Sequence, residues 1–388
     1  MTRYDERTSR CALNRIFGFR PDIAHALVDA FGSASAVFAA DVRSLPPGTA
    51  RYFRQDGGIS DSEYEKSEME LKMLWKHGGI FISDTDPEYP PMLQECPDHP
   101  LGLYARLSQD PEKVFRTGRT FISVVGTRDM SGYGQEWCRR IIFDLADTGG
   151  DICIVSGLAL GCDITAHRAA IERGIPTIAV LPTGIDAVYP KRHTADASRI
   201  RSSDGCAIIS DYPPGTVPLQ VNFIRRNRII AGLSAATVLI ESRERGGGMI
   251  TARLAFSYDR DVYALPGRID DTRSKGCNML IREEVASPVI STDALISGLG
   301  LGQKRKKRTP GDDMAILGQK FSAHLSAEDI SAMATILTRI RENRGIDIET
   351  LAGLCGIGYR KVLELTSLLE SDGMISTDLM QRCTIRIK

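Results

Sequence analysis

The sequence predicts an α/β protein built around a doubly wound parallel β-sheet, with a helical N-terminal part and a C-terminal winged helix. Three observations lead to this prediction. Short apolar runs alternate with helix-like stretches from residue 120 to about 291. Glycine-containing turns follow most of these runs, and apolar residues recur at helical spacing on both sides of the central region.

The first strand and helix of the central region show its repeating unit. The run Phe121–Val125 is mostly apolar and rich in β-branched residues, which is typical of a strand buried on both faces. Gly126 ends this run, and Trp137, Ile141 and Leu145 then recur at helical spacing. A buried strand, a tight turn and a helix form the opening unit of a parallel sheet.

Similar apolar runs continue the alternation further along the chain, with helical stretches between most of them. We expect them to form the remaining strands of one Rossmann-like domain that covers residues 120–297. These predicted strands are Ile152–Ser156, Thr177–Leu181, Ala207–Ser210, Ala236–Glu241 and Val262–Leu265.

Four segments flank this domain. Residues 1–83 read as a helical module of the SAM or helix-hairpin-helix type, which suits contact with either DNA or protein. Residues 84–119 are rich in proline and acidic residues and read as an ordered connector that leads into a short strand, Gly102–Arg106. Residues 298–320 read as a basic, glycine-rich linker. Residues 321–388 show the helix and strand order of a winged helix, for which DNA and protein contact are again both open.

Composition restricts the function and the compartment. The formal net charge is zero, so any affinity for a polyanion must come from a local patch. The nine cysteines are scattered without C-x-x-C or Cys/His pairing, which indicates a reducing compartment and no metal site. No apolar run approaches the ~18 residues of a membrane span, so we expect a cytoplasmic protein.

The predicted turns after the strands all lie at one edge of the sheet, where open α/β sheets bind ligands. Glycine lets the backbone turn sharply or approach a ligand closely, and a helix N-terminus attracts anions. The guanidinium of Arg128 is also suited to phosphate. These turns predict an extended phosphate-binding surface with the candidate DNA-binding residues Gly126, Thr127, Arg128, Ser156, Gly157, Gly246, Gly247, Gly248 and Thr251.

The segment Asn222–Ser234 predicts a helix that adds positive charge to this edge. Its three arginines lie within about one helical turn, and we interpret them as a face that follows phosphates. Phe223 offers a stacking platform for an unpaired base. The alternative is an amphipathic helix with solvated arginines and Phe223 in the core. The candidate residues here are Phe223, Arg225, Arg226, Asn227 and Arg228.

Signatures of cofactor binding and catalysis are missing from the sequence. No G-x-G-x-x-G follows the first strand, and neither a P-loop nor a Ser/His/Asp or H-E-x-x-H pattern occurs. His167 is better explained as a packed residue than as a catalyst. We therefore expect no cofactor and no enzymatic activity.

Six ordered motifs run through the central region. They are GTR (126–128), SGLALGCDITAH (156–167), TIAVLPTGIDAVYP (177–190), RNRIIAGLS (226–234), GGGMITA (246–252) and ALPG (264–267) followed by KGCNMLI (275–281). This set resembles the DprA/Smf family of bacterial natural transformation. The resemblance implies single-stranded DNA binding, protection of incoming DNA, loading of the RecA recombinase, a homodimer formed through the Rossmann-like domain, and no catalysis. It also implies that Arg128 holds phosphate, that Arg226 and Arg228 line the groove, and that Phe223 meets a base.

One departure and two alternatives accompany this resemblance. Gln220 stands where some members of the family carry a lysine, and Arg225 is the nearby residue that can compensate. The first alternative is a nucleotide hydrolase that releases the base from nucleoside monophosphates, although GGGMITARLA lacks the glutamate such proteins carry. The second is a DNA-binding regulator that acts through the winged helix.

Overall fold

The computed structural model describes residues 3–46, 49, 54–55, 58–59, 61–301, 310–322, 324–343, 346–377 and 381–385. The chain forms two compact units, Met1–Gln303 and Lys304–Lys388. Among the described residues, no helix combines the length and the apolar character needed to cross a membrane. The basic run at 304–308 lies outside the described residues.

The first unit is organised around a nine-stranded sheet with the order β11-β10-β9-β5-β6-β7-β8-β4-β3. The seven strands from β11 to β8 are parallel to one another, which confirms the predicted Rossmann-like sheet. They are β5 (Thr120–Val125), β6 (Ile152–Ser156), β7 (Thr177–Val180), β8 (Ala207–Ser210), β9 (Ala236–Leu239), β10 (Asp261–Ala264) and β11 (Ser287–Pro288).

Two antiparallel strands extend this sheet beyond β8. β4 (Gly102–Leu107) pairs with β8, and β3 (Ile80–Ser83) pairs with β4 at the edge. The short strand expected at Gly102–Arg106, at the end of the predicted connector, is therefore confirmed as β4 and belongs to the central sheet. Leu103 and Ala105 of β4 are fully buried in the same core as residues of β7 and β8, and this burial favours the pairing of β4 with the sheet.

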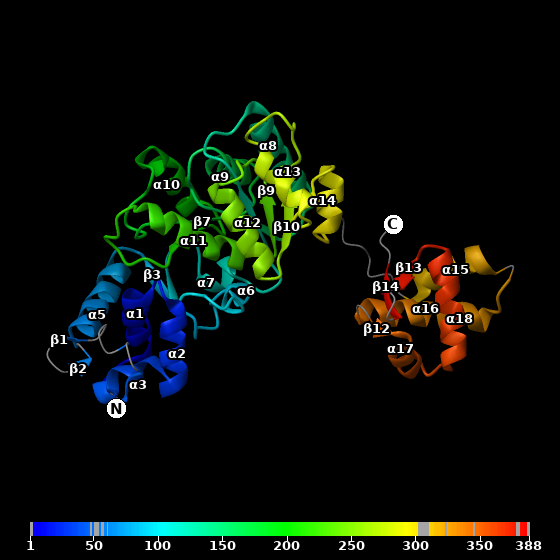
Figure 1. Cartoon of the computed structure of the whole chain (residues 1–388), viewed down its shortest axis with the longest axis horizontal. Helices are drawn as coiled ribbons and strands as arrows, with labels where there is room; N and C mark the ends of the chain where they lie inside the picture. Colours follow the sequence, from blue (N-terminus) through cyan, green and yellow to red (C-terminus); the bar gives the residue numbers. More distant parts are fainter. Residues whose placement is uncertain are drawn as a thin grey trace. The chain divides into compact units, whose positions relative to one another are not determined.

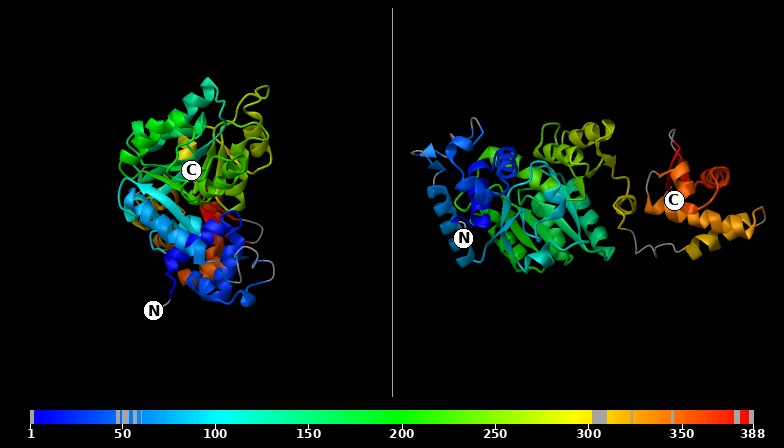
Figure 2. Two further views of the ribbon diagram at one scale, coloured as in Figure 1. Left: turned by 90° about the vertical axis from the view of Figure 1, so that its left-hand side faces the viewer. Right: turned by 90° about the horizontal axis from the view of Figure 1, so that it is seen from below.

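Helices cover both faces of the sheet (Figures 1 and 2). Alternate residues of β5 show the division, because Phe121 and Val125 belong to one apolar core, whereas Ile122 and Val124 belong to the other. The first core includes α11 (Gln220–Leu233), α12 (Gly247–Ser257) and α13 (Lys275–Arg282). The second includes α8 (Gly132–Asp147), α9 (Cys162–Glu172) and α14 (Thr292–Gly298), while α10 (Thr194–Ser202) packs further along that face.

The N-terminal part is helical, with α1 (Glu6–Phe17), α2 (Pro21–Phe31), α3 (Ala34–Ala39) and α5 (Asp61–Lys76). A short 3₁₀ turn, η1 (Val42–Ser44), and the strands β1 (Arg54–Gln55) and β2 (Gly58–Ile59) lie between α3 and α5. Its own apolar core contains Leu13, Phe17, Leu27, Val37 and Phe38, among others.

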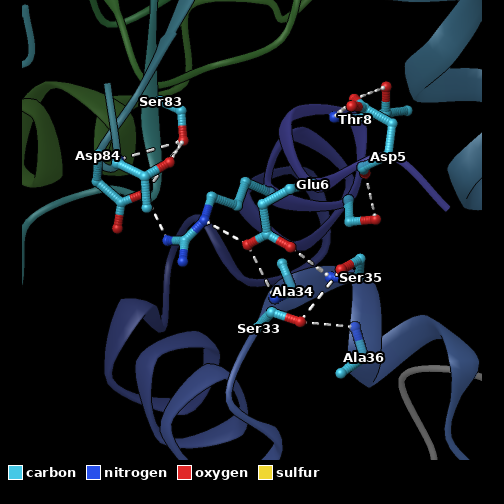
Figure 3. Close-up of polar contacts among 12 residues, drawn as sticks. Asp5, Glu6, Thr8, Ser33, Ala34, Ser35, Ala36, Ser83 and Asp84 are labelled. Atoms are coloured by element: carbon cyan, nitrogen blue, oxygen red, sulfur yellow. Dashed lines mark hydrogen bonds and ion pairs between the residues drawn. The ribbon is translucent and has the colours of Figure 1, made fainter. Parts of the chain in front are cut away.

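Polar contacts join these helices to the sheet. The Glu6 carboxylate accepts hydrogen bonds from the backbone N–H groups of Ala34 and Ser35 at the start of α3 (Figure 3). Arg10 binds Glu6 at 2.7 Å and Asp84, just after β3, at 2.6 Å. These contacts fix α1 and α3 against the edge of the sheet.

The second unit has its own apolar core. Its elements are α15 (Pro310–Phe321), α16 (Ala327–Glu342), β12 (Ile346–Asp347), α17 (Ile348–Cys355), α18 (Tyr359–Ser371), β13 (Ile375–Thr377) and β14 (Arg382–Ile385). The three strands form one antiparallel sheet in the order β12-β14-β13. The linker suggested for 298–320 is shorter in the structure, because α15 starts at Pro310 and buries Leu317 in this core.

Candidate nucleic-acid interface

A cavity of about 670 Å³ opens at the carboxyl ends of β5 and β9. The two strands are neighbours, but the chain continues from β5 to β6 on one side and from β9 to β10 on the other. The strand order therefore reverses between them, and such a switch point is where open α/β sheets bind ligands. The cavity is lined by the turns after β5, β6 and β9, by α11 and by the start of α12.

Most of the predicted site residues line this cavity. They are Gly126, Thr127, Arg128, Phe223, Arg226, Asn227, Gly246, Gly247, Gly248 and Thr251. Sequence reasoning did not assign Asp163, Tyr189 or Ile224 to the site, although all three line the cavity as well. Gln220 is also part of the wall.

Four arginines give the cavity a positive character, against the single carboxylate of Asp163. Arg128, Arg243 and Arg245 are exposed at its rim. Arg243 lies 3.7 Å from the exposed Asp129, an ion pair that water screens strongly. Because the whole chain carries no net charge, this local excess is the feature that attracts an anion.

The mouth of the cavity combines a cation with two aromatic rings. The Arg128 guanidinium lies 4.9 Å from the centre of the Phe223 ring, within cation–π distance. Tyr189 meets the same ring edge-on, with 5.5 Å between ring centres. Phe223 is only partly buried, so the structure contradicts the alternative that placed it in the core.

The glycines of the turns have mostly a packing role. A Cβ atom at Gly126 would lie 3.0 Å from the Glu241 carbonyl oxygen, and one at Gly248 would lie 2.6 Å from Leu239. These glycines let the turns pack on one another, rather than make room for a ligand. Gly247 differs, because it is exposed, has no neighbouring atom within 4 Å of a Cβ position, and begins α12.

The start of α12 is therefore an open helix N-terminus at the cavity. No side chain caps it, and its first N–H groups carry the partial positive charge that favours anions. The side chains of Asn227 and Thr251 both bond the Gly247 carbonyl, at 3.4 and 3.3 Å, and so hold this turn in place. These two residues position the backbone that an anion would meet.

Arg226 lies in the wall of the cavity and is almost completely buried. Its guanidinium donates a hydrogen bond to the Val180 carbonyl at the end of β7, and its Nε has no partner within the described part of the chain. Burial lowers the pKa of Arg226 to about 10, opposed by the charge of Asp163, so it remains charged at neutral pH. Any side chain at Gly157 would overlap this guanidinium.

Asp163 is the buried carboxyl group of the cavity. Its position in the first turn of α9 lets it accept a hydrogen bond from the Ala159 N–H at 3.3 Å. Burial raises the pKa of Asp163, and the charges of Arg226 and Arg128 oppose this rise. The glycine-rich turn after β6 contained this signal, since Asp163 follows it in the first turn of α9.

Four predicted site residues do not line the cavity. Ser156 is fully buried and donates its hydroxyl hydrogen to the Val124 carbonyl at 2.6 Å, and Gly157 makes room for Arg226. Arg228 points away from the cavity and binds the buried Asp211 at 2.7 Å. Arg225 lies against Phe19, 5.2 Å from its ring centre.

These positions correct the interpretation of α11 as a helix with one arginine face. At about 100° per residue, Arg226 points about 100° away from Arg225 and about 160° away from Arg228, so the three do not share one face. Arg225 and Arg228 are about 60° apart, and they reach different partners. Arg225, Arg226 and Arg228 face the N-terminal helices, the sheet end and Asp211, respectively.

His167 is a packed residue, as the sequence suggested. It is fully buried on α9, and its Nδ1 lies 2.7 Å from the Thr177 hydroxyl. Burial lowers the pKa of His167 to about 3, so the ring is neutral at physiological pH. It does not line the cavity.

Fold and site together define a Rossmann-like protein with a positively charged, aromatic-edged groove at its switch point. The sequence model of the DNA recombination-mediator protein A family matches residues 80–300. The chain therefore belongs to this family, which confirms the resemblance to DprA/Smf proteins.

Individual relatives agree with this assignment. Protein Smf of Synechocystis is 38% identical over 240 residues, which are 60% of this chain and 58% of that protein. DNA processing protein DprA of Streptococcus pneumoniae is 36% identical over 233 residues, or 60% of this chain and 75% of that protein. The X-ray structure of S. pneumoniae DprA has a TM-score of 0.59 at 29% identity and covers 76% of this chain and 98% of that chain.

Proposed function

We propose that the protein binds single-stranded DNA at the switch-point cavity and acts as a recombination mediator. The observation that carries this proposal is the pairing of Arg128 with the partly exposed Phe223 ring at the mouth of the cavity. A cation beside an aromatic platform suits a chain of phosphates with unpaired bases, because every base has a face that can stack. Membership of the DNA recombination-mediator protein A family supports the same function.

The cavity offers separate places for the two parts of a nucleotide. The N-terminus of α12 at Gly247, together with Arg243 and Arg245, suits a phosphate. Phe223 and Tyr189 suit the base. In a duplex the base faces are stacked and inaccessible, so we expect this arrangement to favour single strands.

Arg225 and Phe19 suggest how a longer strand continues beyond the cavity. Val221 and Ile224 are exposed on α11, Ile224 belongs to the cavity wall, and Arg225 lies over the 47% exposed ring of Phe19. The contact between Arg225 and Phe19, in the turn between α1 and α2, is thus next in the chain to the cavity wall at Ile224. We infer that bases leaving the cavity pass over these side chains.

The finer parts of the proposal rest on the family resemblance. We propose that the protein protects incoming DNA and loads RecA during natural transformation in the cytoplasm, as a homodimer formed through the sheet domain. We assign the N-terminal helices to a SAM or helix-hairpin-helix type module. We assign α16 to α18 with β12 to β14 to a winged helix.

The affinity for labelled oligonucleotides tests the main proposal. We expect tighter binding to single-stranded than to duplex DNA, with affinity that falls steeply as salt rises. Arg128→Ala should weaken binding to all sequences and reduce the salt slope by about 0.7, the value for one phosphate contact. Arg253→Ala is the matched control, because Arg253 is exposed on α12 outside the cavity and pairs with Glu283. Equal affinity of the Arg128→Ala variant and the wild type would contradict the assignment of this cavity.

A nucleotide hydrolase is the second candidate function, and Asp163 is the residue that favours it. A buried carboxyl group with a raised pKa in a cavity is a feature of catalytic sites as well as of structural ion pairs. Incubation with nucleoside monophosphates, followed by detection of free base, separates the two. Release of base that Asp163→Asn abolishes would favour the hydrolase.

A further inference from the structure

A cluster of His25, Asp84 and His99 lies between the N-terminal helices and the edge of the sheet. Each residue offers one ligand atom, and these atoms all lie within 4.8 Å of one another. His25 belongs to α2, Asp84 follows β3, and His99 lies in the turn before β4. The three residues are far apart in the sequence, so no spacing motif marks them.

The hydrogen bonds of the two histidines fix which nitrogen can bind a metal. His99 Nδ1 lies 2.7 Å from the Cys96 carbonyl oxygen, and His25 Nε2 lies 2.8 Å from the His99 carbonyl oxygen. Carbonyl oxygens only accept, so each of these nitrogens carries the hydrogen. The other nitrogen of each neutral ring then keeps a lone pair, the arrangement found in metal-binding histidines.

Asp84 is held in an orientation that suits a ligand. It is 6% exposed, and its Oδ1 accepts hydrogen bonds from Arg10 at 2.6 Å and from the Ser83 hydroxyl at 3.3 Å. Its Oδ2 lies 3.7 Å from His99 Nε2. Figure 3 shows Asp84 beside Ser83, in the network that also contains Glu6.

We propose that His25, Asp84 and His99 bind a zinc-like divalent cation, with a water molecule as the fourth ligand. Zinc–ligand bonds of about 2.0–2.2 Å place tetrahedral donors roughly 3.3–3.6 Å apart, close to the separation of Asp84 and His99. The bound cation would join α2 to the sheet edge and stabilise the first unit.

The test uses the full chain, stripped of metal with a chelator and then titrated. We expect one equivalent of Zn²⁺ to bind by calorimetry, and Co²⁺ to give the visible absorption of a four-coordinate site. Zn²⁺ should raise the melting temperature of the wild type progressively with concentration, because it binds the folded state.

The variants His25→Gln and His99→Gln should each lower the Zn²⁺ affinity by more than about 100-fold. Loss of a residue that only hydrogen-bonds to a metal ligand costs less than this. Both side chains are only partly buried, so the variants are expected to fold, and unchanged far-UV circular dichroism checks this. His77→Gln is the control, because His77 is exposed and outside the cluster. The absence of a bound equivalent in the wild type, or its retention in His99→Gln, would overturn the site. DNA affinity is not part of the readout, so the result is independent of the proposed function.

Discussion

Replacement of Arg228 by methionine should destabilise the first unit without removing a DNA contact. Arg228 is 9% exposed and binds the carboxylate of Asp211, which is 1% exposed, at 2.7 Å. It also donates a hydrogen bond to the Asp98 carbonyl. Arg228→Met leaves the Asp211 charge buried without its partner, which typically costs about 3–5 kcal/mol. At about 2 °C per kcal/mol for a large domain, the melting temperature should fall by about 6–10 °C.

The pH dependence of this loss identifies its cause. Burial raises the pKa of Asp211, and the charge of Arg228 opposes that rise in the wild type. Without Arg228 the pKa of folded Asp211 rises further above its unfolded value. Protonated Asp211 carries no buried charge, so folding of the Arg228→Met variant is more favourable at low pH. The variant loses this stability as the pH rises through the folded pKa of Asp211. The difference in stability between Arg228→Met and wild type should therefore be smaller at about pH 5 than at about pH 8.

Two further variants make the experiment decisive, with thermal unfolding followed by circular dichroism. Arg225→Met, on the same helix but only partly buried, should change stability by about 0.5 kcal/mol or less, as surface substitutions do. Arg228→Met combined with Asp211→Asn should recover part of the loss, because the uncompensated charge is gone. An equal loss at both pH values, together with no recovery in the double variant, would refute the role assigned to the buried ion pair.

Three further outcomes follow from the cavity. Phe223→Ala should weaken single-strand binding by roughly 5–150-fold in fluorescence anisotropy, since a stacked base contributes about 1–3 kcal/mol, and Phe223→Trp should retain affinity; a loss below twofold would remove Phe223 from the site. Gly157→Ala should displace the guanidinium of Arg226 and lower stability by about 1–3 kcal/mol, and an unchanged melting temperature would show that the wall adapts. Phe19→Ala should weaken binding of long oligonucleotides but spare those short enough for the cavity alone, because Phe19 lies beyond it against Arg225. Equal effects on both lengths would contradict the inferred path.

The sequence by itself determined the central sheet and the place of the candidate site. The apolar runs at residues 121–125, 152–156 and 207–210 match strands of the parallel sheet, because strands covered on both faces need continuous apolar side chains. The alternation with helices fixed the direction of each strand and so brought the turns to one edge. Arg128, Gly247 and Phe223 meet at the cavity for this reason, although they are far apart in the chain.

Only the tertiary structure decided what the individual side chains do. Arg225, Arg226 and Arg228 look equivalent in the sequence, yet they face Phe19, the end of β7 and Asp211, because the part of the fold next to each arginine is different. A glycine can make room either for a ligand or for a neighbouring turn. The sequence therefore does not show that Gly247 faces open space whereas Gly126 packs against a neighbouring turn. The pairing of β4 with β8, and the meeting of His25, Asp84 and His99, depend on contacts between segments distant in the chain. Local sequence patterns predict which residues belong to a helix or a strand, whereas the contacts of each side chain depend on the whole fold.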